Sequence, residues 1–190
     1  MSKIIAVFGG SRPPAHSPEY AEAYTTGKLL AQAGFIVMNG GYAGTMEASA
    51  RGAREHGGKS IGVLSSEFAH LSANEHLSET TMSEDLFARI REMYRRAAGF
   101  IVLKGSMGTL AELALVWNLA KISQQNKPIV LVGEGWQAVL RVWQENLAVT
   151  DEELKLLQVV TRPEQAVELL ARTLRDESRP SPRAPSLATG

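Results

Sequence analysis

The sequence predicts an α/β protein with a doubly wound, mostly parallel sheet and helices on both faces. Short apolar runs rich in β-branched residues alternate with longer stretches of helical period, a pattern typical of parallel strands joined by crossover helices. The run at 99–103 is apolar at nearly every position, as expected for a strand buried on both faces. The 190 residues fit a single Rossmann-like domain, which we place at residues 1–176.

The first strand, helix and second strand are predicted in the amino-terminal part of the chain. Residues 4–8 form an apolar strand. Ser17 followed by Pro18 is typical of a helix start, because serine accepts from the free N–H groups and proline fits the first turn. Gly34 ends this helix, and residues 35–38 form the second strand.

A second helix and a third strand come next. Residues 46–55 form the helix and residues 60–64 form the strand. The stretch 65–81 is polar and has no clear period, so we expect mostly loop, with a short strand near 79–82. Long loops in compact domains are often functional.

The centre of the chain contains a helix, a strand and another helix. Ser83 is the expected cap of a helix over 84–98, because the acidic residues that follow it favour the positive end of the helix dipole. The apolar strand 99–103 follows, and the next helix begins near Gly108. We expect the first of these helices to start near the edge of the sheet where ligands bind.

The carboxyl-terminal part continues the alternation. Strands are predicted at 127–132 and near 159–160, and helices at 136–147 and 163–174. Residues 177–190 are rich in proline and serine, and we expect them to form a disordered tail.

The composition excludes several classes of protein. The 20 basic and 20 acidic side chains cancel, so we expect no general affinity for nucleic acid or for anionic membranes. There is no cysteine, hence no disulfide framework and no thiolate metal site. The first apolar run is too short for a signal peptide, and no segment reaches the roughly 18 apolar residues of a membrane span. We therefore expect a soluble, cytoplasmic protein.

Three glycine-rich loops follow predicted strands and lead toward helices: residues 8–12, 39–45 and 104–109. In this fold, ligands bind at the carboxyl ends of the parallel strands. Glycine lets the backbone approach a ligand closely, and the free N–H groups at a helix start attract phosphate. The alternative is that these glycines only form tight turns. Three such loops at one edge favour phosphate binding, with Ser106 and Thr109 as hydroxyl donors.

Other fingerprints of phosphate binding and catalysis do not fit. Residues 52–60 resemble a Walker A loop, but the spacing is too long and the loop leads into a strand. No Gly-x-Gly-x-x-Gly motif follows the first strand. Ser106 lacks the Gly-x-Ser-x-Gly spacing of a hydrolase, because Lys104 stands at the first glycine. The four histidines show no metal-ligand spacing, and we expect neither a metal nor a cofactor.

Glu112 and an arginine of the preceding helix are candidate functional residues. Glu112 lies about one turn inside the helix that begins near Gly108, on the side that can face a ligand at the loop. An acidic side chain near a helix start is also favourable for the dipole alone. The preceding helix carries Arg89, Arg91, Arg95 and Arg96. Because its start is expected near the ligand edge, Arg89 or Arg91 is favoured.

The stretch Gly105-Ser106-Met107-Gly108-Thr109-Leu110-Ala111-Glu112 resembles the Pro-Gly-Gly-x-Gly-Thr-x-x-Glu signature of the LOG family. The members of this family are cytokinin-activating nucleoside 5′-monophosphate phosphoribohydrolases. Residues 7–11, with Pro18 and Tyr20, are similar to the first strand and helix start of the family. Residues 40–46 are similar to its second glycine loop.

The resemblance covers about residues 3–135 and implies a reaction and a site. The implied reaction is hydrolysis of the N-glycosidic bond of AMP or a cytokinin-type nucleotide, giving free base and ribose 5-phosphate, by a homodimer. An arginine upstream of the signature and the signature glutamate are catalytic in the family, and these positions fall on Arg89 and Glu112. The substrate-binding residues that it implies lie in the glycine loops: Gly10, Ser11, Gly40, Gly41, Gly44, Thr45, Met46, Gly105, Ser106, Met107, Gly108 and Thr109.

Two positions depart from the signature. Lys104 replaces its proline, and Ser106 replaces its second glycine. These departures leave three outcomes open: altered loop geometry, altered ligand choice, or binding without turnover. Relatives of this fold include molybdenum-cofactor carriers, so the alternative function is a non-catalytic nucleotide or molybdenum-cofactor binding protein. We expect the segment 65–81 to take part in selecting the base.

Overall fold

The computed structural model describes residues 2–123, 125 and 127–176. Within them, one sheet contains all the strands: β1 (Ile4–Phe8), β2 (Ile36–Asn39), β3 (Ser60–Ser65), β4 (Glu79–Ser83), β5 (Gly99–Val102), β6 (Ile129–Val132) and β7 (Leu157–Val160). The α-helices are α1 (Pro18–Gln32), α2 (Thr45–Glu55), α3 (Leu86–Arg96), α4 (Met107–Ser123), α5 (Gly135–Asn146), α6 (Asp151–Leu154) and α7 (Pro163–Asp176). A 3-10 turn, η1, spans Ser66–Phe68.

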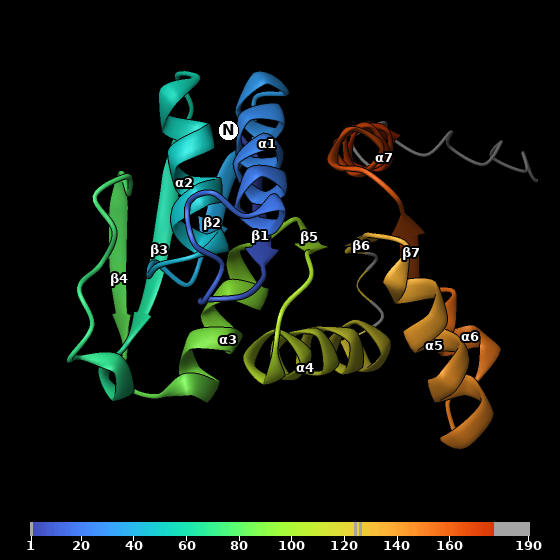
Figure 1. The fold of residues 1–190 in the computed structure, drawn as a ribbon. Coiled ribbons are helices and arrows are strands. Elements are labelled where there is room, and N and C mark those ends of the chain that lie inside the picture. Colours follow the sequence, from blue (N-terminus) through green and yellow to red (C-terminus); the bar gives the residue numbers. More distant parts are fainter. Residues whose placement is uncertain (1, 124, 126, 177–190) are drawn as a thin grey trace, which may run out of the picture.

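The strand order is β4-β3-β2-β1-β5-β6-β7, and every strand pair in the described residues is parallel. The chain begins in the middle of the sheet, builds outward to β4, and then crosses to the other side of β1 to add β5, β6 and β7 (Figure 1). This arrangement confirms the predicted doubly wound α/β fold. Its topological switch point lies between β1 and β5, where the loops that follow the strands diverge.

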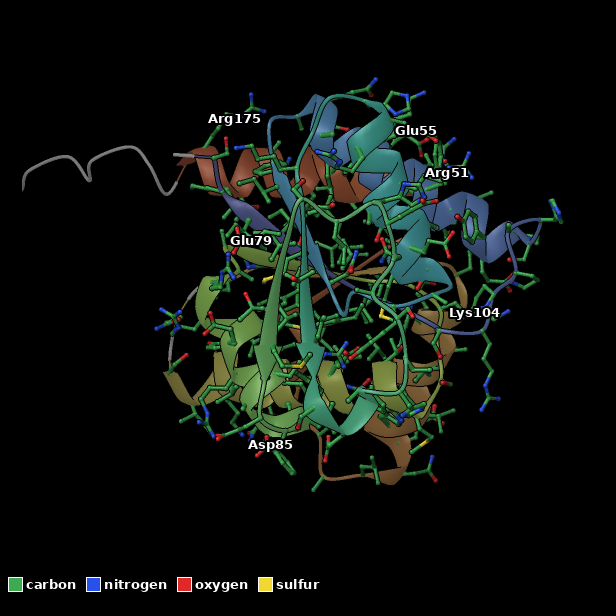
Figure 2. The ribbon with its side chains drawn as sticks, turned by 90° about the vertical axis from the view of Figure 1, so that its left-hand side faces the viewer. Arg51, Glu55, Glu79, Asp85, Lys104 and Arg175 are labelled. Atoms are coloured by element: carbon green, nitrogen blue, oxygen red, sulfur yellow. The ribbon has the colours of Figure 1, made fainter. Side chains whose placement is uncertain are left out.

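Helices cover both faces of the sheet. Figure 1 shows α1, α2 and α7 on one face and α3, α4, α5 and α6 on the other. Successive residues of β1 point to opposite faces, so Ile5 and Val7 belong to the core under α1, α2 and α7, and Ala6 and Phe8 to the core over α3, α4 and α5. In the turned view of Figure 2, Arg51 on α2 lies in the upper helical layer, and Asp85 lies at the start of α3 in the lower one.

The structure corrects the predicted start of α3. Ser83 was expected to cap this helix, but it is the last residue of β4 and pairs with Ser65 of β3. The cap is Asp85, whose side chain accepts from the backbone N–H of Ala88 at 2.7 Å. Sheet pairing therefore takes Ser83, and the helix begins two residues later. The short strand expected near 79–82 is present as β4.

The short helix α6 was not predicted. Its four residues follow Thr150, whose hydroxyl and the Glu153 carboxylate form a capping box. This reciprocal pair stabilises a helical turn too short to show an apolar period. Among the described residues, no helix is long and apolar enough to cross a membrane. The predicted tail at 177–190 lies outside the described residues.

Candidate active site

A cavity of about 160 Å³ opens where β1, β2, β3 and β5 end. Its wall comes from the three glycine loops, the segment between β3 and β4, and helices α3 and α4: Gly9, Ser11, Tyr42, Met46, Phe68, Leu71, Arg89, Ser106, Gly108, Thr109 and Glu112. The cavity lies beside the switch point of the sheet, which is the usual place for a ligand in this fold. This is also the edge at which the sequence places the site.

The first and second glycine loops are locked together behind the cavity. The hydroxyl and the backbone N–H of Thr45 both donate to the carbonyl of Gly10, at 3.0 and 2.9 Å. Gly44 has a φ of 69°, and a Cβ there would lie 2.6 Å from the same carbonyl. The hydroxyl of Thr45 is therefore used to join the loops, and these residues support the cavity from behind.

Three features of its surroundings fix Arg89 in the cavity wall. It is 5% exposed, and its Nε donates to the carbonyl of Val63 at 2.7 Å. The guanidinium carbon lies 5.9 Å from the centre of the Tyr42 ring, a distance typical of a cation–π contact. The absence of a side chain at Gly40 leaves the space into which the guanidinium fits. Arg89 is thus a buried cation with a fixed orientation.

Glu112 faces this cation from the second turn of α4. Its Oε1 lies 3.8 Å from Nη1 of Arg89, and both side chains are buried. Burial raises the pKa of Glu112 to about 7, and the charge of Arg89 partly opposes this effect. Both protonation states of the carboxyl group are therefore accessible near neutral pH. A carboxyl group tuned in this way and placed in a cavity is typical of functional sites.

The start of α4 has backbone N–H groups without an acceptor in the described residues. No acceptor among the described residues takes the backbone N–H of Met107, Gly108 or Thr109, and the first backbone bond of the helix is donated by Leu110 to the carbonyl of Ser106 at 3.0 Å. Free N–H groups at the positive end of a helix dipole attract anions.

Two glycines of this loop differ in what the fold needs. A Cβ at Gly105 would lie 2.0 Å from Oγ1 of Thr109, so packing requires glycine there. At Gly108 a Cβ would meet nothing within 4 Å, and this residue has no positive φ. Glycine weakens a helix by about 1 kcal/mol relative to alanine. The fold gives no reason for Gly108, whereas close approach of a ligand does.

The two departures from the signature lie in different places. Lys104 is exposed, and its Nζ donates to Oε1 of Glu19 at 3.0 Å; Figure 2 labels it at the surface of the molecule. It ties the third glycine loop to the first turn of α1 and does not line the cavity. Ser106 does line the cavity and presents a hydroxyl where the signature has a glycine.

Seven of the residues proposed from the sequence line the cavity: Ser11, Met46, Arg89, Ser106, Gly108, Thr109 and Glu112. The others do not line it: Gly10, Gly40, Gly41, Gly44, Thr45, Gly105 and Met107. Met107 is 77% exposed at the surface. Sequence reasoning did not name four lining residues: Gly9, Tyr42, Phe68 and Leu71. Two signals in the sequence point to three of these residues. Tyr42 lies inside the second glycine loop, and Phe68 and Leu71 lie in the long loop that was expected to select the base.

No group of three or more histidine, aspartate or glutamate side chains within the described part of the chain is placed to hold a metal ion. The expectation of a site without metal or cofactor stays a prediction.

The fold and the site define a Rossmann-like α/β protein whose switch-point cavity combines a helix start with a buried arginine–glutamate pair. The chain belongs to the SLOG cluster4 family, whose family model matches residues 2–167. This match confirms the LOG-like character predicted from the glycine loops.

The chain is also similar to curated proteins of this kind. It is 34% identical to a cytokinin riboside 5′-monophosphate phosphoribohydrolase from Mycobacterium marinum over 150 residues, which cover 77% of this chain and 79% of that protein. The match therefore extends over most of both chains.

Solved structures with the same fold include molybdenum-cofactor proteins. One is the molybdenum cofactor binding protein from Rippkaea orientalis, with a TM-score of 0.72 and 23% identity over 92% of this chain and 98% of that one. Another is the Moco carrier protein from Chlamydomonas reinhardtii, with a TM-score of 0.69 and 26% identity over 92% and 99% of the two chains. The first likeness shows the fold alone.

Proposed function

We propose that the protein is a nucleoside 5′-monophosphate phosphoribohydrolase. It hydrolyses the N-glycosidic bond of AMP or a cytokinin-type nucleotide, giving free base and ribose 5-phosphate. The observation that carries this proposal is the buried pair of Arg89 and Glu112, which shares a cavity with the free N–H groups at the start of α4. The name of the Mycobacterium marinum relative supports the same reaction.

In this proposal the phosphate binds at the start of α4. The N–H groups of Gly108 and Thr109 and the hydroxyl of Ser106 surround it, and Gly108 allows it to approach the backbone. The ribose then lies between this helix start and the pair of Arg89 and Glu112. This places the glycosidic bond next to the carboxylate.

Breaking the glycosidic bond develops positive charge on the ribose, as in glycoside hydrolysis. The ionised carboxylate of Glu112, which is itself buried, stabilises that charge. Water adds to the anomeric carbon, the bond to the base nitrogen breaks, and a proton from water passes to the departing base. The buried guanidinium of Arg89 orients Glu112 and the ligand, and its charge keeps the carboxyl group partly ionised at neutral pH.

The experiment that tests this function is chromatographic detection of free base. Purified protein is incubated with AMP and a panel of other nucleoside monophosphates, with Glu112→Ala in parallel. Release of base by the wild type, nearly abolished in the variant, supports the proposal. Equal release by both proteins would remove Glu112 from the mechanism, and no release from any nucleotide would overturn the proposed reaction.

The second candidate function is a non-catalytic carrier of a nucleotide or of the molybdenum cofactor. The likeness to the carrier from Chlamydomonas reinhardtii and the replacements at Lys104 and Ser106 favour it. Both ligand classes carry a phosphate that fits the start of α4. A carrier retains its ligand in stoichiometric amount without forming product, so the chromatographic experiment separates the two functions.

We further propose that the chain works as a homodimer formed through the outer face of α4. This helix buries Leu113 and Val116 against the sheet, yet Met107 and Ile122 on other sides are 77% and 69% exposed. A helix that is apolar all round is normally covered on all sides. Light scattering of the wild type and of Ile122→Lys tests this proposal, because a lysine at the interface should shift the mass to that of a monomer. The single domain at 1–176 and the cytoplasmic location stay predictions.

A further inference from the structure

The cavity has one wall without any free polar side-chain group. Tyr42, Met46, Phe68 and Leu71 form this wall. The hydroxyl of Tyr42 is already used, because it donates to the carbonyl of Ser65 at 3.2 Å and accepts from the N–H of the same residue at 3.1 Å. The polar side chains of the cavity come instead from the glycine loops, α3 and α4. A ligand therefore meets a polar half and an apolar half.

The segment that brings Phe68 and Leu71 to this wall is tied to the second glycine loop. The backbone N–H of Asn74 donates to the carbonyl of Gly41 at 2.9 Å, and its side-chain amide donates to the carbonyl of Tyr42 at 3.0 Å. The Phe68 ring meets the Tyr42 ring edge-on, with centroids 5.7 Å apart. The Phe68 ring thus packs against the Tyr42 ring and is partly buried.

The next part of the segment is fastened to β3. The hydroxyl of Ser60 donates to the carbonyl of His76 at 2.6 Å, and the N–H of Ser78 donates to the carbonyl of Ser60 at 2.8 Å. The long loop is thus fixed at its middle and its end, and the apolar wall is part of the folded structure.

We propose that Phe68 and Leu71 are the residues that select the base, by stacking and shape and without hydrogen bonds to its edge. The inference rests on the proposed function, because it assumes a nucleoside monophosphate with its phosphate at the start of α4. The base then lies against the apolar wall, where a purine gains more ring contact than a pyrimidine. Leu71 is 47% exposed, so the edge of the base that reaches it is at the mouth of the cavity.

Selection of this kind has a characteristic strength. A site that hydrogen-bonds a group of its substrate rejects an analogue without that group by about 10⁴ to 10⁵, whereas an apolar pocket rejects a near-isostere by about 10² at most. AMP and IMP have nearly the same shape but opposite donors and acceptors on the base edge. The apolar wall therefore predicts that their dissociation constants differ by about tenfold or less, and that UMP binds about tenfold or more weakly than AMP.

The test measures dissociation constants by calorimetry for AMP, IMP, UMP and ribose 5-phosphate, which has no base. The proteins are the wild type, Phe68→Ala, the ring-preserving Phe68→Tyr, and Phe87→Ala as a control. Phe87 is 67% exposed on α3 and does not line the cavity. We expect Phe68→Ala to weaken the binding of AMP and IMP about tenfold and to leave the binding of ribose 5-phosphate unchanged. Phe68→Tyr should lose less affinity than Phe68→Ala because it keeps the ring, and Phe87→Ala should bind like the wild type.

The inference would be overturned if the dissociation constants of AMP and IMP differed by more than about 100-fold. It would also be overturned if Phe68→Ala lost as much affinity for ribose 5-phosphate as for AMP. The expected binding pattern without release of base from any nucleotide would overturn the proposed reaction and leave the inference standing. If no nucleotide binds, both are wrong.

Discussion

A Cβ atom at Gly40 would lie 1.7 Å from Nη2 of Arg89, so the guanidinium occupies space that only glycine leaves open. Gly40 does not line the cavity itself. It leaves room for the guanidinium of Arg89, whose Nε donates to the carbonyl of Val63. The second glycine loop therefore contributes to the site by setting the position of a cation.

Gly40→Ala is expected to displace Arg89 and to lower the rate of base release by about 10² to 10³, the loss typical of removing one preorganised electrostatic group. The measurement is the release rate together with the melting temperature. Gly135→Ala is the matched control, because a Cβ at that position meets nothing within 4 Å, and its rate should equal that of the wild type. In the double variant Gly40→Ala with Arg89→Ala, the loss should not exceed that of Arg89→Ala alone, because both changes remove the same interaction. Additive losses would show that Gly40 acts separately from Arg89.

The pH dependence of catalysis should follow Glu112. Burial raises the pKa of Glu112 to about 7, and the ionised form is the one that stabilises positive charge on the ribose. We expect kcat/KM for AMP to rise with pH through about 7 and then to level off, because kcat/KM reports the ionisation of the free enzyme. The substrate phosphate also ionises near pH 6, so the profile of Glu112→Gln serves as the reference. In that variant kcat/KM should rise only with ionisation of the substrate phosphate. If the rise near pH 7 were unchanged in Glu112→Gln, it would belong to a group other than Glu112.

The same carboxyl group should make the stability of the fold depend on pH. Its folded-state pKa is raised from 4.5 to about 7, so the stabilisation is fully present below about pH 4.5 and is lost as the pH rises through about 7. The free energy of unfolding of the wild type, relative to Glu112→Gln, should fall by on the order of 3 kcal/mol between pH 4.5 and pH 8. Urea unfolding at several pH values measures this difference.

Glu145→Gln on the exposed side of α5 is the control for this measurement. Its difference from the wild type should not change over the same pH range. If the difference for Glu112→Gln were equally flat, the carboxyl group would not be desolvated in the folded protein.

The sequence predicted the strands and most helices because each of them has a local signal. It also favoured Arg89 or Arg91, and the structure places only the first in the cavity. The reason is visible in the helical period, since Arg89 is four residues before Met93 and thus on the apolar side of α3. The glycines were harder to assign, because loop glycines that contact a ligand and those that make room for Thr45 or Arg89 look the same in the sequence.

The apolar wall of the cavity depends on contacts that are distant in the chain. Phe68 and Leu71 reach it because Asn74 is bonded to the loop at 41–42, and no local pattern predicts this pairing. The cap of α3 was missed for a related reason. Ser83 is a good helix cap, but pairing of β4 with β3 takes it into the sheet, so tertiary structure decided between two local preferences.

Gly108→Ala tests whether glycine at this position serves ligand binding or the stability of the fold. A Cβ at this position has open space around it, and alanine is a better helix former than glycine by up to about 1 kcal/mol. The melting temperature should therefore stay the same or rise. The added methyl group would occupy the space in which we place the phosphate, so the dissociation constants of AMP and of ribose 5-phosphate should both rise tenfold or more. Calorimetry with the two ligands measures this change. Tight binding of both ligands by a stable Gly108→Ala variant would move the phosphate away from the start of α4, and with it the positions proposed for the ribose and the base.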